Sequence, residues 1–252
     1  MVDIVTVIIF SLLGSVVSLS GGILLLLSKH RDKLATYATA FAAGALLAAA
    51  FVDLIPEAFS IGDTQLVSYG IFAGILLFFI LEGGLHWFHR HRQNSEDKQT
   101  DPVVPLIIIG DTVHNFIDGV AIAAGFLVSP SIGIIVTLAV AAHEIPQEIG
   151  DFGLLLKRGV KRGKVLLFNA LSAVATTVGA IIFFTIGQNN EFEIAPVLGI
   201  IAGFFIYVAV SDIIPSIHQK RSRSNIIRDS IILIIGAVVV GVVIYLLHDI
   251  TL

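Results

Sequence analysis

Long apolar runs separated by short polar segments dominate the chain. Each run can cross a hydrocarbon core about 30 Å thick at about 1.5 Å of helix rise per residue. Continuous runs rich in Gly, Ala and Leu favour helices over the short alternating strands of a membrane barrel. The pattern predicts an all-α polytopic membrane protein with eight transmembrane helices, at about Ile4–Leu27, Leu34–Phe59, Val67–Phe88, Val104–Val128, Ile132–Leu156, Val165–Gly187, Ile194–Ile217 and Ile231–Leu247.

Composition supports this interpretation. Hydrophobic residues make up 56% of the 252 residues and charged residues only 13%, against about 25% charged in a typical soluble domain. Mean hydropathy is +0.95. These values exclude a soluble globule, a disordered chain and a nucleic-acid binder. The chain has no cysteine, which rules out disulfides, thiolate metal sites and cysteine nucleophiles.

The basic residues are distributed very unevenly. With eight spans, all 15 Lys and Arg fall near loops on one side of the membrane, which the positive-inside rule makes cytoplasmic. Both termini are then expected outside the cytoplasm, with the protein in a plasma (inner) membrane. The first run lacks a basic leader and a cleavage site, so we expect a retained helix. The basic residues are Lys29, Arg31, Lys33, Arg90, Arg92, Lys98, Lys157, Arg158, Lys161, Arg162, Lys164, Lys220, Arg221, Arg223 and Arg228.

Two pairs of segments look like inverted repeats. Spans two and seven share a glycine, an aspartate nine residues later and a proline three residues after that. Spans four and five share a histidine followed by polar residues. The members of each pair run in opposite directions, as in secondary transporters, and predict a 3+2+3 arrangement. Coincidence between low-complexity apolar helices is the alternative. The matching residues are Gly44, Asp53 and Pro56 with Gly203, Asp212 and Pro215, and His114 with His143.

Spans four and five carry an unusual set of polar residues at membrane depth. No Lys or Arg lies within either span to neutralise the acids. An unpaired carboxylate at the bilayer centre costs several kcal/mol, so either a bound divalent cation or protons must compensate. The polar residues are Asp111, His114, Asn115 and Asp118 in span four, and His143, Glu144, Gln147, Glu148 and Asp151 in span five.

The residue types and their spacing favour a metal. His114 with Asp118, and His143 with Gln147, are four residues apart and share a helix face. Imidazole, carboxylate and amide ligands suit zinc, iron(II) or manganese better than copper(I). A structural hydrogen-bond network and a metal-free proton relay remain alternatives.

Three further groups are candidates for contact with metal outside the centre. Asp53, with Glu57, near one end of span two, and Asp212 near the opposite end of span seven, could attract cations where they enter and leave, or could simply cap helix ends. A histidine-rich stretch at the cytoplasmic end of span three could weakly hold released metal, or could be a solvated loop. Its members are His86, His89 and His91.

Two motifs resemble a known family. His114–Gly119 reads HNFIDG and resembles the HNFxDG signature in the fourth span of the ZIP (Zrt-, Irt-like protein) metal transporters. His143–Phe152 reads HEIPQEIGDF and is similar to their HEIPHExGDF signature in the fifth span. The resemblance covers nearly the whole chain and implies a single transmembrane transporter domain over residues 1–252.

The resemblance implies import of a divalent transition metal into the cytoplasm, with zinc first and iron, manganese or cadmium as other cargoes. It also implies a binuclear site, in which Asn115, Asp118 and Glu144 hold the second ion, with Glu148 as a further candidate. Alternating access would slide spans 1, 4, 5 and 6 against spans 2, 3, 7 and 8, often in a homodimer. Gln147 replaces a signature histidine, which leaves zinc selectivity open. The first ion would be held by His114, Asp118, His143 and Gln147.

A transporter and an intramembrane metal-dependent hydrolase both place His and Asp ligands on transmembrane helices. A hydrolase needs a metal with an open position for an activated water, whereas inverted repeats are a feature of transport. The sequence therefore favours a non-enzymatic metal transporter whose partners are metal ions and the lipid bilayer, and no nucleic acid.

Overall fold

The computed structural model describes residues 2–27, 29–92, 103–189, 193–215 and 223–251, and within these ranges it contains helices and no strand. The all-α prediction is confirmed. The helices are α1 (Ile4–Leu27), α2 (Arg31–Ala48), the π-helix η1 (Ala49–Leu54), α3 (Ile55–Ile61), α4 (Thr64–Arg92), α5 (Val103–Val128), α6 (Pro130–Lys157), α7 (Arg162–Asn189), α8 (Ile194–Tyr207), the π-helix η2 (Val208–Ile213) and α10 (Arg223–Thr251).

Seven described helices are long and apolar enough to cross a membrane, which confirms the polytopic membrane class. One of them, Ala35–Ile61, runs without a break through α2, η1 and α3. Helix α1 contributes the shorter apolar stretch Ile4–Ser20. Eight spans, and the placement of both termini outside the cytoplasm, stay predictions.

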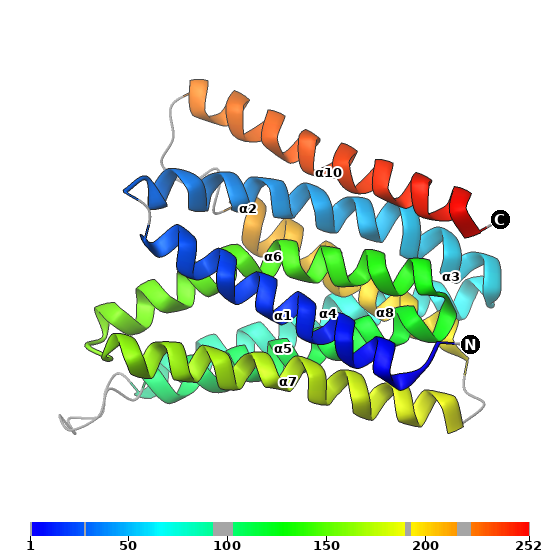
Figure 1. The fold of residues 1–252 in the computed structure, drawn as a ribbon, viewed down its shortest axis with the longest axis horizontal. Helices are drawn as coiled ribbons and strands as arrows, with labels where there is room; N and C mark the ends of the chain where they lie inside the picture. Colours follow the sequence, from blue (N-terminus) through cyan, green and yellow to red (C-terminus); the bar gives the residue numbers. More distant parts are fainter. Residues whose placement is uncertain (1, 28, 93–102, 190–192, 216–222, 252) are drawn as a thin grey trace.

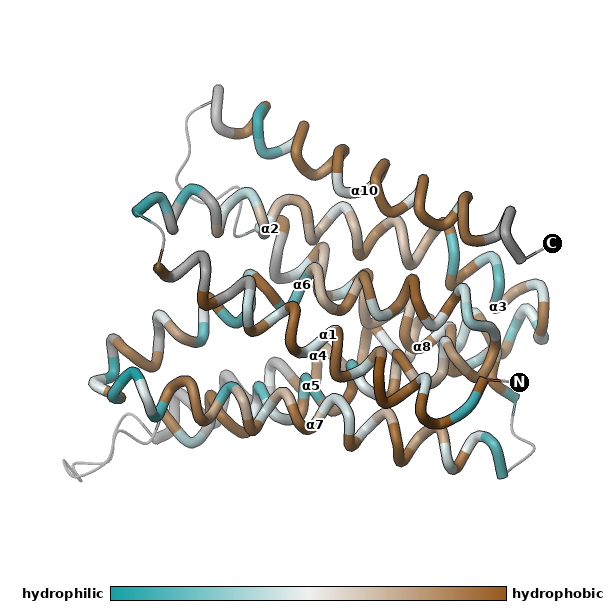
Figure 2. The backbone as a smooth tube through the Cα atoms, viewed as in Figure 1, coloured by the Kyte–Doolittle hydropathy of each residue, from teal (hydrophilic) through white to brown (hydrophobic). Residues whose placement is uncertain are grey.

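The two termini lie at one end of the bundle, and the starts of α2 and α7 lie at the other (Figure 1). Hydrophobic positions line most of α1 and α10, whereas hydrophilic positions gather at the starts of α2 and α7 (Figure 2). Lys33 belongs to the first of these starts and Arg162 to the second. The basic residues in these segments therefore share one end, as the charge pattern predicts, although the cytoplasmic identity of that end remains a prediction.

Two helix crossings show the inverted repeat directly. A Cβ on Gly44 of α2 would lie 1.9 Å from the Leu233 carbonyl oxygen of α10. A Cβ on Gly203 of α8 would lie 2.1 Å from the Ile71 carbonyl oxygen of α4. Only glycine permits such backbone contact. The α2–α10 crossing is thus repeated in the α8–α4 crossing.

The glycines on the partner helices α10 and α4 make the same kind of contact in the two crossings. A Cβ on Gly236 of α10 would lie 2.2 Å from the Phe41 carbonyl oxygen, and one on Gly74 of α4 would lie 2.1 Å from that of Ile200. The sequence shift that maps Gly44 onto Gly203 also maps Phe41 onto Ile200. These matches make coincidence an inadequate explanation for the repeated motif of spans two and seven.

The same two spans contain the described π-helical turns. Asp53 is the fifth residue of η1, and Asp212 is the fifth residue of η2. A proline follows each aspartate by three residues, and its ring would clash with the carbonyl of the residue four positions earlier in a regular helix. The wider turn relieves this clash, so one local sequence pattern produces the same distortion in both repeats.

Candidate metal centre

Adjacent helices supply the four residues at the centre of the bundle. His114 and Asp118 lie one turn apart on α5, and His143 and Glu144 are neighbours on α6. Only Ser129 separates the two helices, so they form the tight antiparallel hairpin expected from the sequence. Because both histidines are near the middle of their helices, the hairpin brings them to the same depth.

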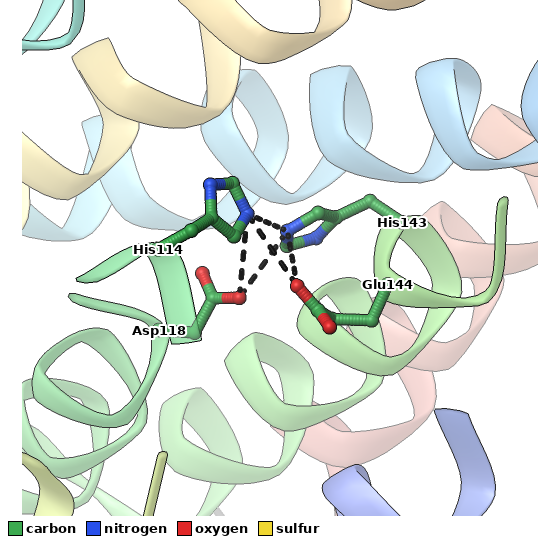
Figure 3. A group of neighbouring side chains, drawn as sticks. All are labelled: His114, Asp118, His143 and Glu144. Carbon is green, nitrogen blue, oxygen red and sulfur yellow. Dashed lines mark hydrogen bonds and ion pairs between the residues drawn. The ribbon is translucent and has the colours of Figure 1, made fainter. Parts of the chain in front are cut away.

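The four side chains point toward one another (Figure 3). The two imidazole Nε2 atoms are 3.2 Å apart. His114 Nε2 lies 3.6 Å from Asp118 Oδ2 and 3.5 Å from Glu144 Oε1. His143 Nε2 lies 3.4 Å and 3.9 Å from the same two oxygens. One ligand atom from each residue lies within 4.8 Å of all the others.

These distances fit a tetrahedral metal. Zinc binds His nitrogen and carboxylate oxygen at about 2.0–2.2 Å, so neighbouring ligands of a tetrahedral site are about 3.3–3.6 Å apart. Most of the measured separations lie within or just outside this interval. Two nitrogens and two oxygens are also a donor set that divalent transition metals accept. The cluster thus needs little rearrangement to hold one ion.

Burial gives the acidic groups of the cluster an unfavourable environment unless their charge is compensated. The Asp118 and His143 side chains are 0% exposed, and those of Glu144 and His114 are 4% and 11% exposed. Among the described residues, neither carboxylate oxygen of Asp118 has a hydrogen-bond partner. No Lys or Arg occurs between Lys98 and Lys157. Buried carboxylates of this kind are stable when they coordinate a cation.

The surroundings of His143 fix which of its nitrogens faces the cluster. Its Nδ1 lies 3.1 Å from the carbonyl oxygen of Ala139. A carbonyl oxygen only accepts hydrogen bonds, so Nδ1 carries the proton and Nε2 presents its lone pair to the cluster. Helix backbone thereby orients the imidazole, as hydrogen-bond partners commonly do for metal-binding histidines.

Aromatic rings of α4 and α8 close the cluster on another side. Phe204 meets both imidazoles edge to face, with ring centroids 5.5 Å from His114 and 6.3 Å from His143. Phe78 stacks on Phe204 at 4.0 Å and meets His114 at 5.6 Å. This aromatic wall excludes water and restricts the rotation of the imidazoles.

Asn115 belongs to a separate hydrogen-bond network with α7. Its Nδ2 donates to Asp111 Oδ1 at 2.9 Å and to Ser172 Oγ at 3.2 Å. Its Oδ1 accepts from Thr176 Oγ1 at 2.9 Å. Glu148, also buried, accepts a hydrogen bond from Asn169 Nδ2. Asn115 and Glu148 are thus held near the cluster by α7.

The structure brings together four of the seven residues expected at the centre. Glu144 is the fourth histidine or acidic side chain of the compact cluster. Gln147, which the resemblance gives to the first ion, is half-buried one turn after His143, and its role as a ligand stays a prediction. The α7 residues that bond Asn115 and Glu148 were not among the residues expected at the site. A polar stripe in an otherwise apolar span was the available signal, at Asn169, Ser172 and Thr176.

The remaining candidates are not members of the compact cluster, or their side chains lie outside the described set. Asp53 is buried at 2% exposure within η1, and Glu57 is half-buried in α3. The Asp212 backbone belongs to η2, but its side chain lies outside the described set. The backbone of the histidine-rich stretch is helical, at the end of α4. The interpretation of this stretch as a loop was therefore wrong. Its side chains are likewise outside the described set; they are His86, His89 and His91.

Comparison with known proteins shows similarity to zinc transporters. The sequence model of a family described as "ZIP Zinc transporter" matches residues 3–106 and 89–244. Zinc transporter ZIP13 of Pongo abelii is 31% identical over 215 residues, which cover 79% of this chain and 63% of that protein. Zinc transporter ZIP4 of Homo sapiens is 38% identical over 132 residues, covering 51% of this chain and 20% of that protein.

A third relative, zinc transporter ZIP10 of Danio rerio, is 36% identical over 133 residues, covering 53% of this chain and 16% of that protein. The chain spans less than two thirds of the length of each of these relatives. The family match nevertheless extends over both repeats and over the α5–α6 hairpin that carries the cluster. The chain belongs to the ZIP zinc transporter family.

Proposed function

We propose that this chain transports a divalent transition metal ion, zinc in the first place, through the α5–α6 cluster. The observation that carries the proposal is the convergence of two imidazole nitrogens and two carboxylate oxygens within 4.8 Å, without a basic side chain nearby. The relatives named as zinc transporters support zinc as the cargo.

The donor set argues for transport rather than hydrolysis. A metal hydrolase keeps one coordination position open for the water it activates. Here the four described donors can complete a tetrahedron, and the aromatic wall of Phe78 and Phe204 covers the imidazoles. Such a site can bind and release an ion, but it offers no obvious place for a second reactant.

The distribution of polar residues supports release toward the basic end of the bundle. From the cluster toward that end, α5 offers Asp111, α6 offers Glu148 and α7 offers Asn169. Toward the termini, the same layer contains buried apolar side chains such as Ile122 and Val136. If the basic end is cytoplasmic, as the positive-inside rule predicts, this conformation is closed to the outside and the direction of transport is import.

The repeated crossings suggest which helices move. Backbone contact at glycines ties α2 to α10 and α4 to α8, which favours two rigid pairs as a fixed frame. The cluster lies on α5 and α6, which pack with α1 and α7. Alternating access then consists of a movement of the α1, α5, α6 and α7 bundle relative to that frame. A plasma-membrane location and a homodimeric assembly complete the proposal.

Zinc uptake into proteoliposomes tests this function. Purified protein should carry radioactive zinc into vesicles down an imposed gradient, and His114→Ala should reduce the rate at least tenfold because it removes one of four donors. His30→Ala, which changes an exposed histidine before α2, is the matched control and should transport normally. Uptake that is unaffected by His114→Ala would refute the role of the cluster, and absence of zinc uptake by the wild type would refute the proposed cargo.

A further inference from the structure

The turn between α6 and α7 carries a third of the basic residues of the chain. Five of the eight residues from Lys157 to Lys164 are Lys or Arg, out of 15 in the whole sequence. No Asp or Glu occurs between Asp151 and Glu191, so no acidic residue nearby in the sequence balances this charge. The turn is therefore strongly positive.

The backbone of this turn is held in one conformation. Gly159 has φ of +81°, in the left-handed region that favours glycine. Its N–H donates to the Leu156 carbonyl oxygen at 3.0 Å. The Val160 N–H donates to the Leu155 carbonyl oxygen at 3.1 Å, and the two bonds together end α6 in a Schellman motif. Val160 also packs against the apolar cluster that includes Leu155 and Val165. The turn therefore presents its basic residues from a fixed backbone.

Three basic side chains of the turn are exposed and uncompensated. They are Lys161, Arg162 and Lys164. In the part of the chain that the structure describes, no carboxylate lies within 4.0 Å of their cationic groups. Arg228 at the start of α10 differs, because Asp229 pairs with it at 2.9 Å. The three cations of the turn are therefore available to an anion from outside the chain.

The position of the turn places these cations at the level of the lipid headgroups. The apolar spans Pro130–Gly153 and Arg162–Asn189 end and begin on either side of it. The turn therefore lies where both helices leave the hydrocarbon, next to the phosphate groups of the lipids. Long Lys and Arg side chains can reach those phosphates while their methylene stems stay on the apolar surface.

An exposed apolar stripe continues along α7 directly from the basic residues. Leu167 and Leu171 lie three and seven residues after Lys164, so all three share one face of the helix. Both leucines are more than half exposed, at 54% and 59%, and Val174 on the same face is 52% exposed. The surface thus has a cationic head and a long apolar tail, which matches the two parts of an anionic phospholipid.

We propose that the α6–α7 turn binds the headgroup phosphate of an anionic phospholipid through Lys161, Arg162 and Lys164, with the acyl chains along the apolar stripe of α7. A soluble anion would use the cations but not the stripe. An acidic protein segment would reach the turn but not the part of α7 inside the hydrocarbon. The bound lipid would hold the end of α6, the helix that carries His143, at the level of the headgroups.

A single engineered cysteine tests the proposal. The chain has no cysteine, and a Cβ on the exposed Gly163 would meet nothing within 4 Å. Gly163→Cys therefore accepts a fluorophore beside the three cations. The full-length labelled protein, in uncharged micelles, is titrated with phosphatidylglycerol that carries a nitroxide quencher near its headgroup. Quenching should reach half its maximum at a concentration at least tenfold lower than with phosphatidylcholine that carries the same quencher.

Two pairs of substitutions locate the lipid. In the labelled protein, Lys161→Gln with Lys164→Gln should weaken phosphatidylglycerol binding more than tenfold, because each basic residue near an anionic headgroup contributes about fivefold in affinity. Lys29→Gln with Lys33→Gln is the matched control. It removes the same charge from exposed lysines in and after the α1–α2 turn, and it should weaken binding less than threefold. Equal weakening by both pairs would overturn binding at the α6–α7 turn.

A second label position tests the place of binding independently. Ser60 is exposed in α3, at the end of the bundle that holds the termini (Figure 1). A fluorophore on Ser60→Cys should be quenched equally by phosphatidylglycerol and phosphatidylcholine. A preference for phosphatidylglycerol at both label positions would overturn the proposal, because the anionic lipid would then gather around the whole protein.

Competition identifies the ligand and separates this proposal from the transport function. Millimolar inorganic phosphate should leave the phosphatidylglycerol signal in place, and its complete displacement by phosphate would overturn a lipid as the ligand. Equal quenching by the two lipids at Gly163→Cys would also overturn the proposal. The assay contains no metal, so its result does not depend on zinc uptake. Zinc binding to Lys161→Gln with Lys164→Gln, measured by equilibrium dialysis, should equal that of the wild type and show that the variant is folded.

Discussion

Glycine at the α2–α10 crossing should be essential for stability. In Gly236→Ala the new Cβ would lie 2.2 Å from the Phe41 carbonyl oxygen, whereas a relaxed contact between carbon and oxygen is about 3.3 Å or longer. The two helices would have to separate locally by about 1 Å. Overpacking of this kind costs about 1–3 kcal/mol. Alanine also gains about 1 kcal/mol of helix propensity over glycine, which partly hides the loss.

A second glycine of the same helix removes this ambiguity. A Cβ on Gly241 would meet nothing within 4 Å, so Gly241→Ala receives the propensity gain without the clash. The difference between the two variants isolates the packing loss, which we expect to be about 1–3 kcal/mol. Reversible unfolding in mixed micelles, followed by circular dichroism, gives both values. Equal stability of the two variants would refute the close crossing. Gly74→Ala, the counterpart in the other repeat, should resemble Gly236→Ala.

Three further substitutions address the metal centre. Gln147→His should shift competitive uptake toward zinc over manganese, since imidazole replaces a neutral amide; an unchanged preference would place the residue outside the ligand set. Phe204→Ala should weaken zinc binding about tenfold in equilibrium dialysis, because it releases both imidazoles from edge-to-face contact, whereas the equally buried Phe126→Ala should lower only thermal stability. Thr176→Val should destabilise the protein by about 0.6–1.7 kcal/mol in micelle unfolding, because it removes the donor to Asn115; unchanged stability would contradict that hydrogen bond.

The sequence predicts the helices and the pair of spans that carries the centre, because both depend on local periodicity. Apolar runs define the spans, and the His114 and His143 segments are close in the chain, so their hairpin follows from the short turn between them. Helical spacing also places Asp118 one turn from His114 on the same face. These features need no knowledge of how distant helices pack.

The rest depends on contacts between spans that are far apart in the chain. Spacing along α6 alone does not place Glu144 beside the imidazoles, where its Oε1 lies 3.5 Å from His114 Nε2. Phe204 could not be singled out among 17 phenylalanines without the position of α8 beside the imidazoles. The π-helices also escape prediction by apolar periodicity, because that pattern does not distinguish them from ordinary helix.

The repeat symmetry is broken where the cargo is expected. The shift that maps His114 onto His143 also maps Gly119 onto Glu148. A Cβ on Gly119 would lie 1.9 Å from the Thr176 carbonyl oxygen, so α5 and α7 touch through their backbones at this point. The counterpart position of α6 holds the larger Glu148 instead, which borders a small cleft that Ser15 and Ser18 of α1 also line. A protein built from two similar halves thus acquires a close-packed side and a polar side. Glu148→Gly should therefore let α1 approach α6, remove the cleft and reduce metal uptake. It should also lower stability in micelle unfolding by about 1 kcal/mol or more, because glycine weakens the helix and Asn169 loses its acceptor. Unchanged uptake in that variant would show that the asymmetry has no part in transport.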